Sequence, residues 1–299
     1  MSNSFQNPIL DGYADPDILC SGGLYYLFAT SYLLGCRGYE VYSSPDLVHW
    51  ENRGVCLSRA WGMEQNFWAP DVKEKDGKIY MLVTVSEHLG LALADSPLGP
   101  FSPQNGFLLD KTIDGHIFFD GEEMYLYYVS WRKDHRYGLY GVKMLPDRRN
   151  PDFSTETLLI TAEEPYECGM SPVAEAPYML KKDGKYFLTY SGSHYRDPGY
   201  CVCYAVSDSP LGPFVKYAGN PILVGDGVTV SGTGHHCITC SPDGKRMILC
   251  YHTHYAPGTV DPRRLSLTEL RFEEKNGETV LVCGKADVGI SHPLPLSGL

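Results

Sequence analysis

A short turn followed by an aromatic-rich segment recurs five times along this chain of 299 residues. The copies are GGLYYLF from Gly22, DGKIYML from Asp76, DGEEMYL from Asp120, DGKYFLT from Asp183 and DGKRMIL from Asp243. Asp-Gly between apolar segments is a strong signal for a β-hairpin, because both central residues of a type I′ turn need positive φ. The sequence therefore predicts five hairpins, one in each of five similar units.

A second turn follows the hairpin in several units. DSPLGPF occurs at 95–101 and again at 208–214, and SPDLVHW at 44–50 is a looser relative. Gly and Pro close a tight turn here, and the aromatic residue at the end starts the next strand. Each unit is therefore predicted to contain four antiparallel strands.

Four antiparallel strands repeated five times, without a long helical period, are typical of a five-bladed β-propeller. A β-sandwich is the alternative, but it gives no reason for similar hairpins to recur at such long intervals. We therefore expect an all-β chain in which residues 1–299 form a single propeller domain.

Composition narrows the possible partners and the compartment. The net charge is −11 and the pI is about 5.3, and no basic cluster exceeds three residues, which argues against nucleic acid as a partner. No apolar segment approaches the length that spans a membrane. The first residues, MSNSFQNPILDGYADPD, lack the basic and apolar regions of a signal peptide. Ten cysteines without such a signal favour reduced thiols, and hence a cytoplasmic protein.

The strand before each Asp-Gly turn should line the central channel, where the first strands of all blades meet. In chain order these strands contain ADPD, WAPD, IDGH, EAPY and GHH. Alignment on the shared proline places Asp15, Trp68 and Glu175 one or two residues ahead of it, directed toward the axis. Asp17 and Asp71, which follow the proline, are interpreted as acceptors for neighbouring backbone N–H groups.

Three carboxyl groups from different blades, Asp15, Asp114 and Glu175, are thus predicted to converge. An Asp beside Pro is commonly a turn former only, but acids around a small cavity shift one another's pKa. Glycoside hydrolysis needs one protonated and one ionised carboxyl, separated by roughly 6.5–9.5 Å when the reaction inverts configuration. Blades one and four face each other across the funnel, so Asp15 and Glu175 suit that gap. Asp114 should lie beside Glu175 and, when ionised, raise its pKa.

Five motifs in this order, ADPD, FWAPDV, TID, EAPYMLKKDGKYFLTYS and GTGHH, resemble glycoside hydrolase family 43 over essentially the whole chain. The resemblance implies an inverting β-xylosidase, α-L-arabinofuranosidase or arabinanase. It also implies that Asp15 is the general base and Glu175 the general acid. Asp114 would then tune the pKa of that acid and orient the substrate.

Three further positions follow from the resemblance. His235 of GTGHH would help to hold a calcium ion in the channel, with water supplying most ligands because a neutral imidazole suits Ca²⁺ poorly. The alternative is that His235 only hydrogen-bonds the acids. An arginine near the C-terminus would reach a sugar hydroxyl, and alternation in PRRLSLTEL favours Arg264, with Arg263 as the alternative. Trp68 offers an apolar face to a sugar ring, or is simply a buried aromatic.

Three other functions compete with this interpretation. A retaining invertase-like fructosidase is suggested by Glu167-Cys168 and by Arg196-Asp197-Pro198, but these motifs stand in the reverse of that family's order and NDPNG is missing. A glycoside phosphorylase would need a basic phosphate pocket. A sugar-binding propeller without activity would have no need for three converging acids.

The expected activity is exo-hydrolysis of oligosaccharides from hemicellulose or pectin. A blind pocket closed by loops between the blades suits the removal of one terminal residue at a time. We expect that residue to be an α-L-arabinofuranosyl or a β-D-xylosyl group.

Overall fold

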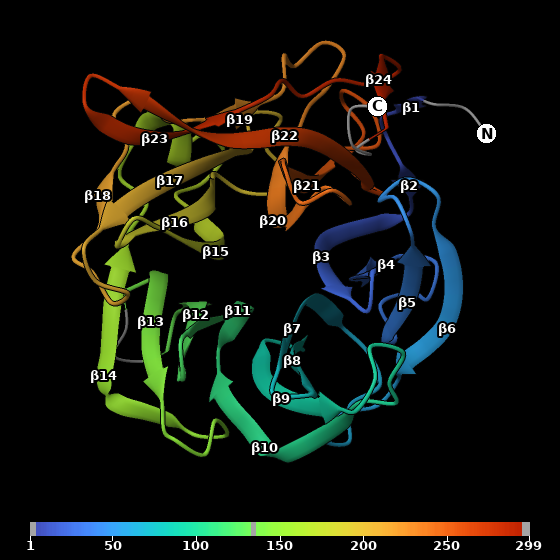
Figure 1. Ribbon diagram of the computed structural model, residues 1–299, viewed down its shortest axis with the longest axis vertical. Coiled ribbons are helices and arrows are strands. Elements are labelled where there is room, and N and C mark those ends of the chain that lie inside the picture. The colour runs from blue at the N-terminus through green and yellow to red at the C-terminus, as the bar shows by residue number, and fades with distance from the viewer. Residues whose placement is uncertain (1–3, 133–135, 295–299) are drawn as a thin grey trace.

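The computed structural model describes residues 4–132 and 136–294 and consists of five antiparallel sheets around one axis, a five-bladed β-propeller (Figure 1). Blades one to three have four strands each, as predicted. They are β3 (Tyr13–Ser21), β4 (Leu24–Ser31), β5 (Tyr39–Ser44) and β6 (Glu51–Leu57); β7 (Phe67–Lys75), β8 (Lys78–Val85), β9 (His88–Ala94) and β10 (Ser102–Asp110); and β11 (Thr112–Asp120), β12 (Glu123–Ser130), β13 (Gly138–Met144) and β14 (Pro151–Ile160).

The last two blades have an additional strand each. Blade four contains β15 (Ala174–Lys182), β16 (Lys185–Gly192) and β17 (Cys201–Ser207), and two short strands, β18 (Val215–Lys216) and β19 (Leu223–Val224), both pair with β17. Blade five contains β20 (Gly234–Cys240), β21 (Met247–Thr253), β22 (Arg264–Lys275), β23 (Glu278–Cys283) and, from the N-terminal segment, the short strand β2 (Leu10–Asp11). A 3-10 helix, η1 (Pro165–Glu167), precedes β15. No helix in the described ranges is long and apolar enough to cross a membrane.

The repeated turns lie where the sequence places them, between the first and second strands of each blade. Both central residues have positive φ at Asp76-Gly77 and at Asp183-Gly184, as a type I′ turn requires. The two DSPLGPF segments connect β9 to β10 and β17 to β18. The periodicity of the sequence thus predicts the hairpins of the blades.

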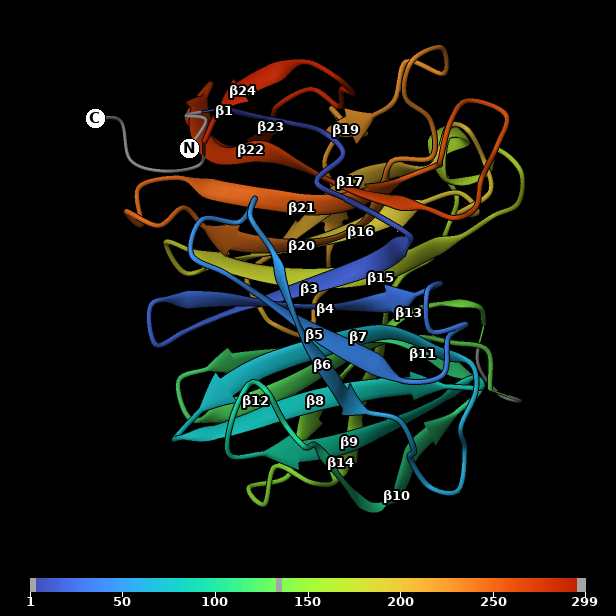
Figure 2. The same cartoon turned by 90° about the vertical axis from the view of Figure 1, so that its right-hand side faces the viewer.

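The ring is closed by the N-terminal segment. Strand β2 (Leu10–Asp11) pairs with β22 of blade five, and the chain then continues into β3 of blade one. Strand β1 (Ser4–Gln6) pairs with β24 (Ser291–Pro293), so the two ends of the described chain lie side by side (Figure 1). In the side view, β3 runs beside β20, which joins the first blade to the last (Figure 2).

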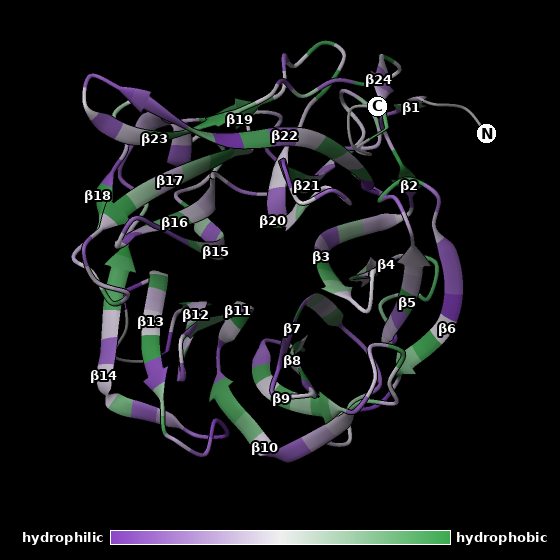
Figure 3. Ribbon diagram, in the orientation of Figure 1, coloured by the Kyte–Doolittle hydropathy of each residue, from purple (hydrophilic) through white to green (hydrophobic). Residues whose placement is uncertain are grey.

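Apolar side chains are buried mainly between neighbouring blades. One cluster joins Phe28 and Tyr39 of blade one to Phe67 and Met81 of blade two, and all four side chains are fully buried. The outermost strands are more polar, and β6 and β14 carry hydrophilic segments (Figure 3). Since the packing of sheet against sheet fixes the blades, the innermost strands hold their side chains in defined positions around the axis.

Candidate active site

A bulge interrupts the innermost strand of every blade at the same place. The register with the second strand shifts there in β3, β7, β11, β15 and β20. The bulged residue has a left-handed φ although it is not glycine: Asp15 (53°), Ala69 (38°), Asp114 (55°), Ala176 (53°) and His235 (40°). Bulges re-aim side chains, and such strained residues concentrate at functional sites. The five blades thus use one backbone device to present side chains to the channel.

Glu175 and Trp68 occupy a different position, one residue before the bulge. Their strand partners across the blade are Ser191 and Thr84. Glu175 is buried, whereas Trp68 is half-buried and its carbonyl accepts a hydrogen bond from the Tyr39 hydroxyl at 2.8 Å. The structure therefore brings Asp15, Asp114 and Glu175 to the same end of the channel. Asp15 and Asp114 occupy the bulged position of their strands, and Glu175 occupies the position just before the bulge.

Asp15 is held as an ionised carboxylate. Its Oδ1 lies 2.8 Å from Arg263 Nη1 and 3.1 Å from His252 Nδ1, and its Oδ2 accepts a hydrogen bond from the Thr30 hydroxyl at 2.7 Å. Burial alone would raise the pKa of Asp15, but the charge of Arg263, together with His235 and His252, outweighs it and holds that pKa well below the usual value. This group is charged throughout the neutral range.

The pKa values of Asp114 and Glu175 are raised, in contrast to that of Asp15. Burial raises the pKa of Glu175 to about 7, and the negative charge of Asp15 adds to that effect, while a hydrogen bond from the Tyr200 hydroxyl at 2.7 Å opposes it. Burial and the charge of Glu175 raise the pKa of Asp114 well above its usual value. Two adjacent buried carboxyls titrate as a pair, so near neutral pH the pair retains a proton. The sequence analysis expected Asp114 to be the ionised partner, whereas its buried position favours the neutral form.

The structure places Arg263, rather than Arg264, against the acids. Besides Asp15, Arg263 contacts Tyr32, whose hydroxyl accepts a hydrogen bond from Nε at 2.8 Å. The Arg264 guanidinium lies over the Tyr255 ring at 5.1 Å, and its Nε is 3.9 Å from Asp11. Strand alternation could not separate the two arginines, because residues 265–267 of β22 are buried on both faces.

His235 lies between the two aspartates. Its Nδ1 is 3.3 Å from Asp15 Oδ1 and 3.8 Å from Asp114 Oδ2, and its backbone N–H donates to Ser191 Oγ at 2.8 Å. Burial lowers the pKa of His235 to about 4, so the imidazole is neutral.

The predicted calcium ion finds no ligand set in the described part of the chain. No group of three His, Cys, Asp or Glu side chains there has a geometry that could hold a metal ion. Ca²⁺ binds through six to eight oxygen atoms, whereas His235 offers nitrogen and Asp15 is already paired with Arg263. A calcium ion beside His235 that takes most of its ligands from water stays a prediction, and no step is assigned to it.

A second layer of polar residues closes the channel beneath the acids. Asp17 accepts a hydrogen bond from the Val72 N–H at 2.6 Å, and Asp71 accepts one from the Ile117 N–H at 2.8 Å, so both are backbone acceptors as interpreted from the sequence. Lys73 bridges the two carboxylates. The cavity that remains between the two layers measures about 20 Å³, enough for about one water molecule. The two layers therefore leave little open space in this part of the channel.

The two motifs that resemble invertase-like enzymes anchor loops. Glu167 is fully buried, accepts hydrogen bonds from the N–H groups of residues 163 and 164, and pairs with Lys216 at 2.6 Å. Asp197 accepts hydrogen bonds from the Met170 N–H and the Ser193 hydroxyl, both at 2.6 Å. The Asp197 contact with Met170 ties the loop before β15 to the loop after β16, and the Glu167 contacts hold the first of these loops to β18.

Sequence reasoning missed Tyr200 and His252, which contact Glu175 and Asp15 respectively. His252 is the strand partner of Gly234, at the same place in blade five that Thr30 has in blade one and Ser191 in blade four. Polar residues recur at this end of the second strands, and this recurrence could have identified His252 from the sequence. Tyr200 follows a loop and has no such signal.

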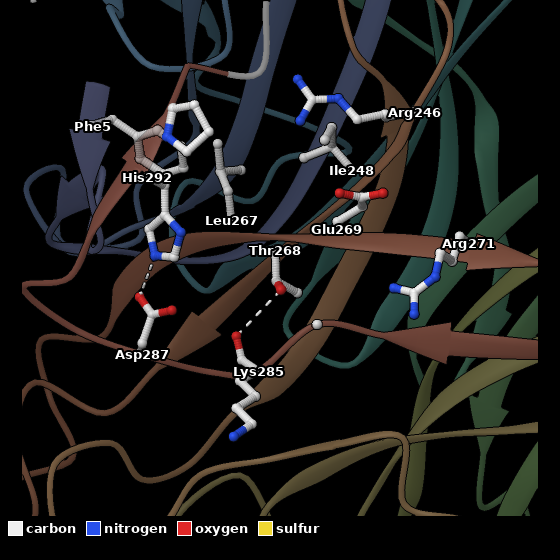
Figure 4. Close-up of a pocket in the computed structure, with 12 residues that line it drawn as sticks. Phe5, Arg246, Ile248, Leu267, Thr268, Glu269, Arg271, Lys285, Asp287 and His292 are labelled. Atoms are coloured by element: carbon white, nitrogen blue, oxygen red, sulfur yellow. Dashed lines mark hydrogen bonds and ion pairs between the residues drawn. The ribbon is translucent and has the colours of Figure 1, made fainter. Parts of the chain in front are cut away.

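A separate cavity of about 430 Å³ lies between the β1/β24 pair and blade five (Figure 4). Ile248 and Leu267 line it, and His292 is 2.9 Å from Asp287 at its edge. None of the three candidate acids lines this cavity. The candidate active site is therefore the end of the channel at which the bulged strands bring Asp15, Asp114 and Glu175 together.

Comparison with known proteins gives consistent matches over most of the chain. The profile of glycosyl hydrolases family 43 matches residues 5–277. A β-D-galactofuranosidase of Aspergillus niger is 27% identical over 92% of this chain and 84% of its own length. A xylosidase/arabinosidase of Bacteroides ovatus is 28% identical over 83% of this chain and 84% of its own. The crystal structure of a thermostable family-43 glycoside hydrolase superposes with a TM-score of 0.86 at 34% identity, covering 98% of this chain and 100% of that one.

Proposed function

The chain belongs to glycosyl hydrolase family 43 and is a glycosidase, and we propose that it is an exo-acting enzyme that inverts configuration. Asp15 acts as general base on water, and Glu175 protonates the departing oxygen. The observation that carries this assignment is the opposite electrostatic environment of the two buried carboxyls. Arg263 holds the pKa of Asp15 low, whereas burial raises that of Glu175 to about 7. Carboxyls whose pKa values are pushed apart in this way divide into base and acid.

Other groups at the site orient this pair. Arg263 fixes Asp15 with a charged hydrogen bond and presents its guanidinium beside the same carboxylate that would activate water. Asp114 influences the titration of Glu175 through its charge, and its Oδ2 accepts a hydrogen bond from the Ala176 N–H at 3.3 Å. Trp68, half-buried and one residue before the bulge, offers an apolar surface to the sugar ring.

The proposed substrates are oligosaccharides with terminal α-L-arabinofuranosyl or β-D-xylosyl residues. The printed name of the Bacteroides ovatus relative, a xylosidase/arabinosidase, supports this choice. A xylosidase removes terminal xylosyl residues, so the same name also supports the exo mode of action. A panel of nitrophenyl glycosides, including β-D-galactofuranoside, tests the sugar. Rapid loss of viscosity from linear arabinan with little free monosaccharide would contradict the exo proposal.

The stereochemical proposal has a direct test. Proton NMR of the first product formed should show the anomer opposite to that of the substrate, because water attacks from the side of Asp15 while Glu175 protonates the leaving group. Retention of configuration, or a covalent glycosyl-enzyme trapped with a fluorinated substrate, would favour the retaining alternative and exclude Asp15 as a base.

A further inference from the structure

Two buried aromatic side chains connect the proposed base to the proposed acid. The Tyr200 hydroxyl donates a hydrogen bond to Glu175 Oε1 at 2.7 Å. The Tyr200 ring stacks on the His252 ring, with centroids 5.5 Å apart and planes 11° from parallel. His252 Nδ1 lies 3.1 Å from Asp15 Oδ1. A continuous path of contacts thus runs from one carboxylate to the other through Tyr200 and His252.

This pair of rings has no room to shift. Both side chains are fully buried. The Tyr200 N–H donates to the Asp197 carbonyl at 3.0 Å, and the Tyr200 carbonyl accepts a hydrogen bond from the Thr233 hydroxyl at 3.1 Å. A Cβ atom at Gly234 would stand 2.2 Å from the Tyr200 ring, so the ring lies directly on the backbone of β20. The rings therefore form a rigid spacer.

We propose that Tyr200 and His252 are a positioning pair that sets the separation of Asp15 and Glu175 and leaves Glu175 Oε2 as the oxygen that carries the transferable proton. The proposal rests on the acid and base roles assigned above. Because Oε1 accepts the Tyr200 hydroxyl hydrogen, the carboxyl proton occupies the other oxygen. The separation matters because it decides whether a water molecule fits between the carboxyl and the sugar.

His252 can act as a spacer without adding charge to the site. Burial and the neighbouring Arg263 lower the pKa of His252 to about 3, so its ring is neutral at any pH near neutrality. Arg263 Nη1 is 3.3 Å from both ring nitrogens, which places the guanidinium over the ring. The imidazole is thereby in contact with both Arg263 and Tyr200.

Removal of the Tyr200 hydroxyl has a predictable effect on the pH profile. The ionisable groups that face Glu175 are Asp15 from β3, Asp114 from β11 and Arg263 before β22, and Tyr137 before β13 is a neutral neighbour. Among these contacts the Tyr200 hydrogen bond stabilises the ionised form of Glu175. Without it, the pKa of Glu175 rises further. The acid must be protonated to work, so the alkaline limb moves to higher pH.

The first experiment compares Tyr200→Phe with the unaltered enzyme on an oligosaccharide substrate. We expect the alkaline limb of kcat to move up by roughly half a unit to one unit. At the optimum, kcat should fall about 5- to 20-fold because Glu175 loses its orientation, with little change in KM. Tyr204→Phe is the matched control, since Tyr204 is also fully buried and its hydroxyl accepts a hydrogen bond from the Leu281 N–H, far from the acids. Its pH profile should not move.

The second experiment displaces the ring without removing a polar group. Gly234→Ala pushes Tyr200 off β20 and should reduce kcat on oligosaccharide and activated aryl glycoside alike, because both carboxyls change position. An unmoved alkaline limb in Tyr200→Phe, or full activity in a folded Gly234→Ala enzyme, would overturn the proposal. Tyr200→Phe removes one oxygen atom only, so it decides the matter even if Gly234→Ala does not fold. Retention of oligosaccharide hydrolysis by Glu175→Ala would instead refute the underlying acid assignment.

Discussion

At the scale of single residues, the proposed roles of Glu175 and Asp15 differ in their dependence on the leaving group. A nitrophenol departs as a stable anion, whereas a sugar alkoxide needs a proton from Glu175. Glu175→Ala should therefore lose about 10²–10⁴-fold more activity on an oligosaccharide than on an aryl glycoside. Asp15→Ala should abolish both activities, since every substrate needs an activated water. The two roles would be exchanged if Glu175→Ala lost activity equally on both substrates while Asp15→Ala kept its activity on the aryl glycoside.

Arg263 should control the acidic limb of the pH profile. Burial raises the pKa of Asp15, and the charge of Arg263 is the largest opposing influence. In Arg263→Gln the effect of burial prevails and the pKa of Asp15 rises. The base must be ionised, so activity should appear only at higher pH, and the acidic limb of kcat/KM should move upward. Arg264→Gln is the control and should leave that limb in place. If Arg264→Gln moved the acidic limb and Arg263→Gln did not, Arg264 would be the functional arginine, as strand alternation favoured.

The convergence of the three acids could be predicted from the sequence because each stands on the innermost strand that precedes a repeated turn. Arg263 could not be distinguished in this way, since its partner Asp15 is 248 residues away and both meet only when the ring is closed. Tyr200 follows an irregular loop, and its contact with Glu175 depends on how that loop returns over β20. Local patterns thus identify strand residues but not the loop residues that support them.

At the scale of elements, the bulge is the unit that repeats, and it can be tested within one strand. Ala176 in β15 is left-handed with φ of 53°, whereas Ala174 lies two residues earlier and does not have positive φ; both are buried. Glycine adopts left-handed φ without strain. Ala176→Gly should therefore be neutral or stabilising by up to about 1 kcal/mol, whereas Ala174→Gly should destabilise by about 1 kcal/mol. Urea unfolding of both variants measures the difference. Equal destabilisation would show that the bulge carries no strain.

The sequence predicted the hairpins better than the bulges. Asp-Gly turns have a local chemical requirement for positive φ, so they can be recognised directly. Bulged residues here are Asp, Ala or His, none of which marks a left-handed conformation by itself. Only the recurrence of the position in all five blades makes the bulge evident, and that recurrence becomes visible once strand register is known.

At the scale of the whole molecule, the N-terminal segment closes the ring, and Asn7 contributes to that closure from a buried position. Its side chain donates to the Leu267 carbonyl at 2.9 Å and accepts a hydrogen bond from the Leu267 N–H at 2.8 Å. These contacts join the start of the chain to the last blade across 260 residues. No repeat in the sequence predicts them, because the closing segment is the one part of the ring that is not a copy of the others.

Asn7→Ala should therefore weaken the whole ring rather than one blade. The substitution leaves the Leu267 N–H and carbonyl without these partners, which costs about 1–3 kcal/mol for each buried group. The melting temperature should fall by roughly 5–10 °C in one cooperative transition, with activity preserved well below it. Asn150→Ala is the control, because Asn150 is exposed and its side chain bonds to Asp147 within its own turn. If both variants melt together, closure depends on the β2–β22 and β1–β24 pairs, and the Asn7 side chain adds nothing to it.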